Sequence, residues 1–301
     1  MMEKEETENV LKRRSYRSCI SSAYHDVKDN LWTITKKNWR IFLFIAVLQA
    51  AISTWNASLS LGINYVGFDM KPVPLTVCGL LAVASDLLLM AAAFRIINGR
   101  ALAWNIRRAF STLPATILFT LACGIVLLIA FVAYAMSSKT PENIPVWRLA
   151  IITLAWLPLY LILSVPVTYV YTRYMIEPET KLRKIFIPAY GNAFRSWGFI
   201  VVTGFLALLC YILTNLMLCL PDHVLTIVYN RAAYGTTAYG DPMGLPGYFG
   251  ILKFFTSLLN HGIGIYLTVF TTYVFYYIYQ TVSIKTSDRK ARRNRKEDSR
   301  Q

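Results

Sequence analysis

Charged residues are scarce in this chain. Asp, Glu, Lys and Arg make up 16% of its 301 residues, whereas 55% are hydrophobic. A soluble domain carries about a quarter charged residues. The charge is also unevenly placed, because long segments carry almost none while the ends and a few loops are dense in Lys and Arg. This distribution excludes an ordinary soluble protein and indicates several membrane-spanning helices.

Acidic residues are fewer than basic ones, 16 against 31, and the net charge is +15. A strongly basic chain invites a nucleic-acid-binding interpretation. Here the basic residues flank apolar segments and form no soluble domain of their own. We therefore expect no nucleic-acid partner.

Recognisable catalytic motifs are missing. The sequence has no G-x-S-x-G, no H-E-x-x-H, no P-loop and no dinucleotide-binding fingerprint. Its five cysteines form no C-x-x-C pair and are expected to be small packing residues. Asp222, His223 and Asp241 share one connection, but adjacent Asp and His match no metal-ligand spacing. No catalytic residue, metal or cofactor is therefore assigned, and an enzyme is the less favoured interpretation.

Six apolar segments are long enough to cross a bilayer, which takes about 20 helical residues. They lie near 41–66, 75–97, 115–137, 149–175, 198–220 and 250–284. Residues 1–19 are polar, and no apolar run that would serve as a cleavable signal follows before residue 41. The sequence thus predicts an all-α polytopic membrane protein whose six spans lie within residues 20–284.

The basic residues predict the orientation of these spans. Of the 31 Lys and Arg, 26 fall in the two terminal segments and the second and fourth connections, which lie on one side of a six-span protein. The positive-inside rule then places both termini in the cytoplasm, in a bacterial inner membrane. The basic tail, 285–301, has no apolar residue to bury, and we predict that it is disordered.

Three cytoplasmic segments carry an apolar stripe with helical spacing. They are 20–38, 101–113 and 181–197, and each precedes an out-and-back pair of spans. We predict that each is a helix lying in the inner membrane interface, so that the chain contains three repeats of interfacial helix and transmembrane hairpin. Basic residues expected at the lipid interface are Lys36, Lys37, Arg107, Arg108, Lys181 and Lys184.

The segments "LWTITKKNWRIFLFI", "NIRRAFSTLPATILFT" and "KIFIPAYGNAFRSWGFIVV" carry this pattern. In this respect the chain resembles the six-helix membrane domain of some bacterial glycerophosphodiester phosphodiesterases and related inner-membrane proteins. The resemblance covers residues 20–284 and implies the fold. The phosphodiesterase activity of those enzymes belongs to a separate soluble domain, so it is not implied here.

Short six-span bacterial proteins that this chain also resembles are sometimes labelled carotene-cleaving oxygenases. That chemistry needs an iron site, usually built from several histidines. The chain has three, His25, His223 and His261. The predicted topology places the first in the cytoplasm and the second outside, so we do not expect them to converge.

Asp86 interrupts the apolar run "LLAVASDLLLM". We expect it about 16 Å below the outer edge of the second span. An Asp at mid-bilayer costs about 2.5–3.5 kcal/mol, so it demands a partner or a proton. Either it is an ion or proton site, or it accepts an interhelical hydrogen bond from Ser, Thr, Tyr or Asn.

Asn260 and His261, in the last span, complete the candidate intramembrane polar site. If the crossing begins near Tyr248, His261 lies level with Asp86. If the helix instead breaks at the glycines 262 and 264, His261 lies at the outer edge. An Asp–His pair inside a bundle is typical of proton coupling.

Pro158 and Pro166 lie eight residues apart in the fourth span. Both are candidate helix kinks, because proline lacks the N–H that its helix would use. One interpretation is a broken helix at a transport site. The other is ordinary curvature of a membrane helix.

Three functions fit this sequence. The first is a non-enzymatic membrane protein that acts through membrane lipids or a partner membrane protein. The second is a small proton-coupled permease that uses Asp86. The third is a membrane-embedded enzyme with a site in the outer connection, 221–247, for which we predict a short helix at 224–229 and a turn region at 233–242.

Overall fold

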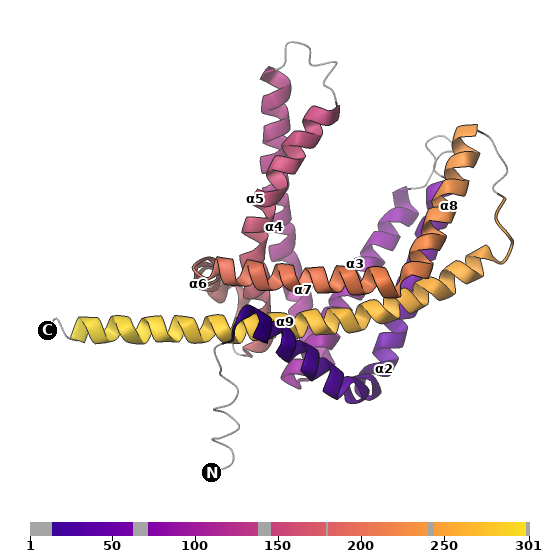
Figure 1. Ribbon diagram of the computed structural model, residues 1–301. Coiled ribbons are helices and arrows are strands. Elements are labelled where there is room, and N and C mark those ends of the chain that lie inside the picture. The colour runs from indigo at the N-terminus through magenta and orange to yellow at the C-terminus, as the bar shows by residue number, and fades with distance from the viewer. Residues whose placement is uncertain (1–13, 63–71, 138–145, 179, 240–243, 299–301) are drawn as a thin grey trace. The chain divides into compact units, whose positions relative to one another are not determined.

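The computed structural model describes residues 14–62, 72–137, 146–178, 180–239 and 244–298 (Figure 1). These residues form eight α-helices and no β-strand. The helices are α2 (Tyr16–Gly62), α3 (Pro72–Asn98), α4 (Leu102–Ser137), α5 (Val146–Ile176), α6 (Leu182–Phe194), α7 (Trp197–Leu218), α8 (Leu220–Tyr239) and α9 (Phe249–Asp298). The all-α class that the sequence predicts is confirmed.

Five stretches of the described residues are long and apolar enough to cross a membrane. They are Thr76–Asn98, Leu102–Tyr134, Ile151–Ile176, Trp197–Leu218 and Phe249–Arg289. They coincide with the second to sixth predicted spans, and the chain is a multi-pass helical membrane protein. The first predicted span, 41–66, lies in α2 and runs beyond the described residues, and α2 is not among the five.

The chain folds as two compact units. The first unit comprises Arg17–Ile106 and Gly204–Val274, and the second comprises Arg107–Thr203 and Phe275–Gln301 with the residues up to Tyr16. In the first unit, α2, α3 and α9 share an apolar core that includes Ile45, Ala92 and Val269. In the second unit, α5 packs against α6.

The three predicted interfacial helices differ from one another. The segments 20–38 and 101–113 continue into the following helix as parts of α2 and α4, whereas the third segment forms the separate helix α6. Neither Gly nor Pro stands between residues 20 and 40, so nothing in the sequence ends the helix there. Figure 1 shows α2 changing direction between its indigo start and its purple end.

Two predicted irregular segments are helical. The tail, predicted to be disordered from residue 285, continues α9 as far as Asp298. Its Lys, Arg, Glu and Ala are good helix formers, and extending a packed helix needs no new nucleation. The short helix predicted at 224–229 falls within α8, which runs to Tyr239. The predicted turn region, 233–242, is helical as far as Tyr239, and its last three positions lie outside the described residues.

Gly99 ends α3. It adopts a left-handed φ of 67°, and its N–H donates to the carbonyl oxygen of Arg95 at 3.0 Å. Glycine is favoured at this position because a side chain would be strained there. The end of α3 therefore places Arg95 in its last turn, where it meets the basic segment of α2.

Candidate functional site

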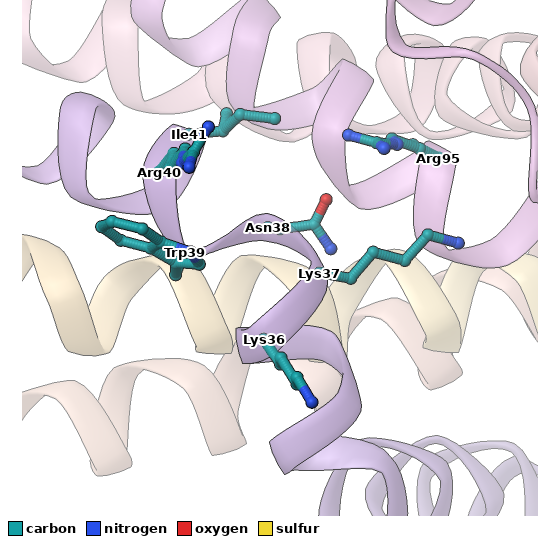
Figure 2. A pocket seen from close by; sticks show the side chains of 7 residues that line it. All are labelled: Lys36, Lys37, Asn38, Trp39, Arg40, Ile41 and Arg95. Carbon is teal, nitrogen blue, oxygen red and sulfur yellow. The ribbon is translucent and has the colours of Figure 1, made fainter.

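A basic pocket lies between α2 and the end of α3 in the first unit. Its volume is about 340 Å³, within the range of small-molecule sites. It is lined by Lys36, Lys37, Asn38, Trp39, Arg40, Ile41 and Arg95. Figure 2 shows Lys37 and Arg95, which come from different helices, on the same side of Asn38. Four of the seven lining side chains are cationic and none is acidic.

The cations of this pocket have no carboxylate partner in the part of the chain that the structure describes. Within the described residues, none of its four basic side chains forms an ion pair with Asp or Glu. Lys36, Lys37 and Arg40 are exposed, and Arg95 is half-buried. Like charges gathered without a counterion raise the local concentration of anions. The pocket is therefore suited to an anionic ligand.

Asn38 is the buried polar residue of the pocket. It is 1% exposed. Its amide nitrogen donates to the carbonyl oxygen of Ile34 at 3.0 Å, which fixes the orientation of the amide. Its Oδ1 atom is buried and accepts no hydrogen bond. Figure 2 shows this oxygen pointing toward the space between Ile41 and Arg95. Buried acceptors are nearly always paired, so this atom marks a place for a donor.

The tryptophan that lines the pocket, Trp39, is exposed, and so is Trp32 earlier on α2. Trp32 is 78% exposed and Trp39 is 51% exposed on the same helix. Trp39 also lies 5.5 Å from the guanidinium of Arg40. Exposed Trp beside Lys and Arg is typical of the membrane–water boundary, where the ring contacts lipid and the cation contacts headgroups.

Of the other basic residues predicted at the lipid interface, three are exposed and one is buried. Arg107, Lys181 and Lys184 are exposed. Arg108 is buried: its guanidinium donates to the carbonyl oxygens of Pro178 and Thr180, each at 2.9 Å. Arg108 thus binds the backbone that follows α5, and it differs from the interfacial position that we predicted. Helical spacing alone does not show whether an Arg side chain faces the membrane interface or packs against the protein.

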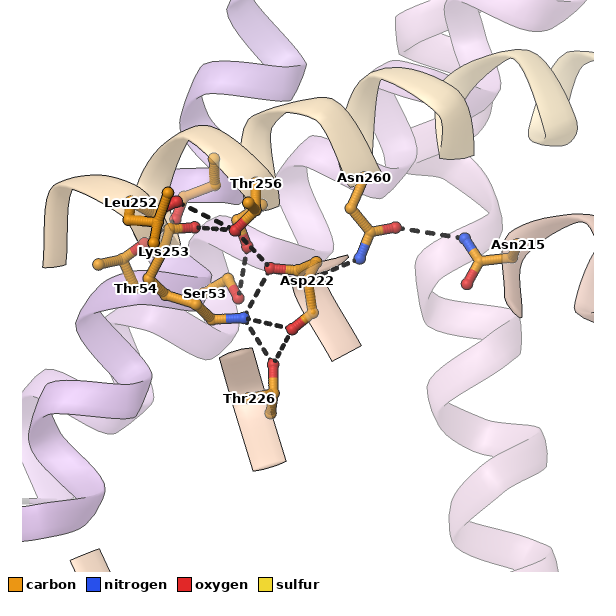
Figure 3. A network of polar contacts seen from close by, with 11 residues as sticks. Ser53, Thr54, Asn215, Asp222, Thr226, Leu252, Lys253, Thr256 and Asn260 are labelled. Atoms are coloured by element: carbon orange, nitrogen blue, oxygen red, sulfur yellow. Dashed lines mark hydrogen bonds and ion pairs between the residues drawn. The ribbon is translucent and has the colours of Figure 1, made fainter. Parts of the chain in front are cut away.

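A second polar cluster joins α7, α8 and α9 in the first unit (Figure 3). The ammonium of Lys253 lies 2.7 Å from Oδ1 of Asp222, and both side chains are buried. The same ammonium donates to Thr226 Oγ1 at 2.6 Å and to the Asp222 carbonyl oxygen at 3.4 Å. Three acceptors thus meet the three N–H groups of the lysine.

The Asp222 carboxylate is equally well bound. The Asn260 amide donates to its Oδ2 at 2.8 Å, and the Thr256 hydroxyl donates to its Oδ1 at 3.3 Å. Burial by itself would raise the pKa of Asp222, but the hydrogen bonds from Lys253 and Asn260 and the lysine charge lower it below the ordinary value. The carboxylate is therefore a stable anion that ties α8 to α9.

Asn260 belongs to this cluster and not to a site with Asp86. Its Oδ1 accepts from the amide of Asn215 at 3.2 Å, which extends the cluster to α7. The cluster is a buried network in which the charged groups are satisfied, so it has the properties of a structural clamp. From the sequence we considered Asp222 only as a metal ligand, and we did not expect it to pair with Lys253.

Asp86 has an interhelical partner. The amide nitrogen of Gln49, on α2, donates to Asp86 Oδ1 at 2.9 Å and to the hydroxyl of Ser85 at 3.2 Å. The partner is a glutamine, which was not among the residue types that we expected. Asp86 is otherwise exposed.

His261 lies in an unbroken helix. α9 continues through the glycines 262 and 264, so the predicted alternative of a break there is wrong. His261 is half-buried, and it lies within electrostatic range of Asp222 and Lys253. No hydrogen bond or ion pair joins the described side chains of His261 and Asp86.

α2 contacts α9 at two places. The hydroxyl of Thr35 lies 2.8 Å from that of Tyr266, and the hydroxyl of Ser257 donates to that of Ser53 at 3.2 Å. Gln49, the partner of Asp86, stands between these two positions on α2, and His261 stands between their partners on α9. Asp86 and His261 thus belong to two helices that both contact α2.

The two prolines lie inside a continuous helix, α5, in the second unit. The carbonyl oxygen of Ile162, which Pro166 cannot bond, accepts from the indole N–H of Trp197 at 3.2 Å. The hydroxyl of Tyr190 donates to the next carbonyl, that of Leu163, at 3.2 Å. Trp197 therefore satisfies the carbonyl that Pro166 leaves without an N–H partner, and Tyr190 adds a hydrogen bond to the carbonyl beside it.

Metal-binding and disulfide chemistry find no support in the described residues. They contain no group of three or more His, Cys, Asp or Glu that could hold a metal ion. Asp241 lies outside the described residues. All five cysteines are free, and four of them are buried as expected of packing residues, whereas Cys210 is exposed.

Comparison of the chain with protein-family models, curated proteins and solved structures gives no match. The basic pocket is therefore the candidate site on its physical properties alone. Sequence reasoning named Lys36 and Lys37 but missed Asn38, Arg40 and Arg95. One signal was present, because Asn38 follows Ile34 by four residues and so places an amide on the apolar face of α2.

Proposed function

We propose that this protein is an inner-membrane protein that acts by binding anionic membrane lipids on its cytoplasmic side. It performs no reaction on them. Its basic segments hold the inner leaflet, and the apolar spans anchor these segments at a fixed depth. A partner membrane protein would join the same lipid-bound surface.

One observation carries the proposal. Four cations without acidic partners line one pocket beside the exposed Trp39, at the end of the apolar helix α3. The ends of membrane helices meet the headgroup region, where each Lys or Arg contributes about 1 kcal/mol to binding an anionic leaflet. The resemblance to the membrane domain of the phosphodiesterases agrees with a lipid-facing role but adds no residue to it.

The orientation is part of the proposal. It rests on the 26 of 31 basic residues that the predicted topology collects on one side. Lys37→Cys, in a chain whose five cysteines are replaced by Ala, tests it in intact cells. We expect a membrane-impermeant maleimide to label this cysteine only after the membrane is permeabilised. Labelling of intact cells would place the pocket outside and contradict the proposal.

Lipid binding is tested with a variant that removes pocket charge. Lys37→Gln, Arg40→Gln and Arg95→Gln are combined, and lipids retained after purification in mild detergent are measured by mass spectrometry. We expect the enrichment of anionic over zwitterionic lipid to fall about tenfold or more relative to the unmodified protein. The control combines Arg289→Gln, Arg292→Gln and Arg295→Gln, which removes the same charge from the end of α9.

A specific observation also supports the permease as a second candidate. Asp86 is an exposed carboxylate in an apolar helix. An ionisable residue within a span is commonly part of an ion or proton path.

A further inference from the structure

We propose that the basic pocket is a specific site for a phosphate ester that carries a hydrogen-bond donor beside its phosphate. The cations of the pocket bind the phosphate, and the buried Asn38 Oδ1 accepts from a hydroxyl or ammonium group of the same ligand. This inference rests on the proposed function and deepens it, because it adds a chemical preference among anions.

The phosphate half of the site comes from two helices. Lys37 and Arg40 lie on α2 and Arg95 lies on α3, so a ligand in the pocket meets cations from two helices. Arg presents a planar fork of N–H donors that matches phosphate oxygens, and Lys adds a point charge. No acidic side chain lines the pocket. The site therefore rejects cations and accepts an anion.

The hydrogen-bond acceptor of the site is the side-chain oxygen of Asn38. Its amide nitrogen is engaged by Ile34 at 3.0 Å, so the amide is not free to turn and offer its N–H groups to the pocket. What the buried side chain presents is a carbonyl oxygen without a partner. A bare phosphate diester has no donor for this oxygen, so the buried acceptor stays unpaired when such a ligand binds. A ligand with an O–H or N–H beside its phosphate satisfies both halves of the site.

Two sources supply this chemistry. A membrane lipid with a glycerol headgroup carries hydroxyls next to its phosphate, and a soluble phosphate ester such as glycerol 3-phosphate carries the same groups. The exposed Trp39 in the lining and the apolar span that carries Arg95 in its last turn favour the lipid. The experiment separates the two sources.

The test uses the full chain in nanodiscs of phosphatidylcholine with one anionic lipid added in small amount. The anionic lipid is either phosphatidylglycerol or phosphatidylmethanol. Both carry one negative charge on a phosphate diester, but only phosphatidylglycerol has hydroxyl donors. Bound lipid is counted by native mass spectrometry after release. We expect the unmodified protein to retain phosphatidylglycerol about fivefold more strongly than phosphatidylmethanol, the ratio expected for one buried hydrogen bond.

Equal retention of the two anionic lipids would overturn this inference while leaving the proposed function intact. Failure to retain either anionic lipid over phosphatidylcholine would overturn both. Addition of glycerol 3-phosphate at millimolar concentration identifies the source. Displacement of phosphatidylglycerol supports a soluble ester as the natural ligand, and retention supports the lipid.

Asn38→Ala removes the acceptor, and we expect it to reduce the fivefold preference to about one while anionic lipid is still enriched. Asn30→Ala is the matched control. Asn30 lies on the same helix and makes the same type of hydrogen bond, to the carbonyl oxygen of Asp26 at 3.0 Å, but it is exposed and outside the pocket. A preference that survives Asn38→Ala would contradict the role of this residue. If Asn38→Ala does not fold, the comparison of the two lipids on the unmodified protein still decides.

Discussion

The indole N–H of Trp197 donates to the carbonyl oxygen of Ile162 at 3.2 Å, and Ile162 lies four residues before Pro166. In an α-helix this carbonyl would accept the N–H of residue 166, which proline does not have. A membrane offers no water to take its place. Trp197 therefore substitutes for the missing backbone donor and ties α7 to α5.

Trp197→Phe removes this donor and keeps an aromatic ring. We expect it to lower the free energy of unfolding by about 1 kcal/mol, the usual scale of an interhelical hydrogen bond in a membrane protein. The measurement is reversible unfolding by SDS in mixed micelles. Pro166→Ala restores a backbone N–H to Ile162, so Trp197→Phe should cost less in that background. Equal costs in the two backgrounds would show that the indole N–H does not serve this carbonyl.

The buried pair of Lys253 and Asp222 predicts a strong asymmetry between single and double substitutions. Lys253→Met leaves a buried carboxylate without its cation, and we expect a loss of about 3–5 kcal/mol. Lys253→Met combined with Asp222→Leu removes both charges, and we expect most of that loss to be recovered. The same SDS unfolding measurement tests this. A double variant no more stable than Lys253→Met would mean that the two charges are not coupled.

The matched control for the buried pair is the partly exposed ion pair of Arg173 and Glu177, whose side chains are 27% exposed and 2.9 Å apart. Arg173→Met leaves Glu177 bound by the hydroxyl of Tyr279 at 2.8 Å. Exposed pairs of this kind contribute about 0.2–1 kcal/mol. We therefore expect Arg173→Met to cost no more than about 1 kcal/mol, well below Lys253→Met.

The lowered pKa of Asp222 predicts a dependence of stability on pH. Its stabilisation is fully present above the unfolded value of about 3.9, and it is lost as the pH falls through the lower pKa of the folded state. We expect Asp222 to contribute no change between pH 7 and pH 5 and a progressive loss below about pH 4. Thermal unfolding in non-ionic detergent measures this. Asp222→Asn should lack the acid-side loss, and parallel curves for the two proteins would contradict the prediction.

Asp86→Asn separates a packing role from a proton site. An asparagine oxygen still accepts from Gln49, so we expect the variant to fold with a stability within about 1 kcal/mol of the original. Gln49→Leu, which removes the donor and leaves the carboxylate, should cost more. Uptake of protons into proteoliposomes, followed with a pH-sensitive dye, is expected to be the same for Asp86→Asn and the unmodified protein. Loss of a solute-dependent proton flux in Asp86→Asn would instead favour the permease.

The sequence by itself determined the class of this protein and most of its spans. A run of about 20 apolar residues must form a helix in a bilayer, because no water remains there to bond its backbone. That argument needs only local composition, and it predicted α3, α4, α5, α7 and α9. Helix ends were less predictable: basic residues after Ile284 continue α9, since an existing helix extends at little cost.

Only the tertiary structure decided which polar groups meet. Asp86 finds Gln49, 37 residues away, and Lys253 finds Asp222, 31 residues away. Helical spacing predicts the face on which a side chain lies, but not which neighbouring helix covers that face. Asn38 shows the same limit, since its four-residue spacing from Ile34 places it on the apolar face, while only the folded structure shows that its oxygen is buried without a hydrogen-bond partner.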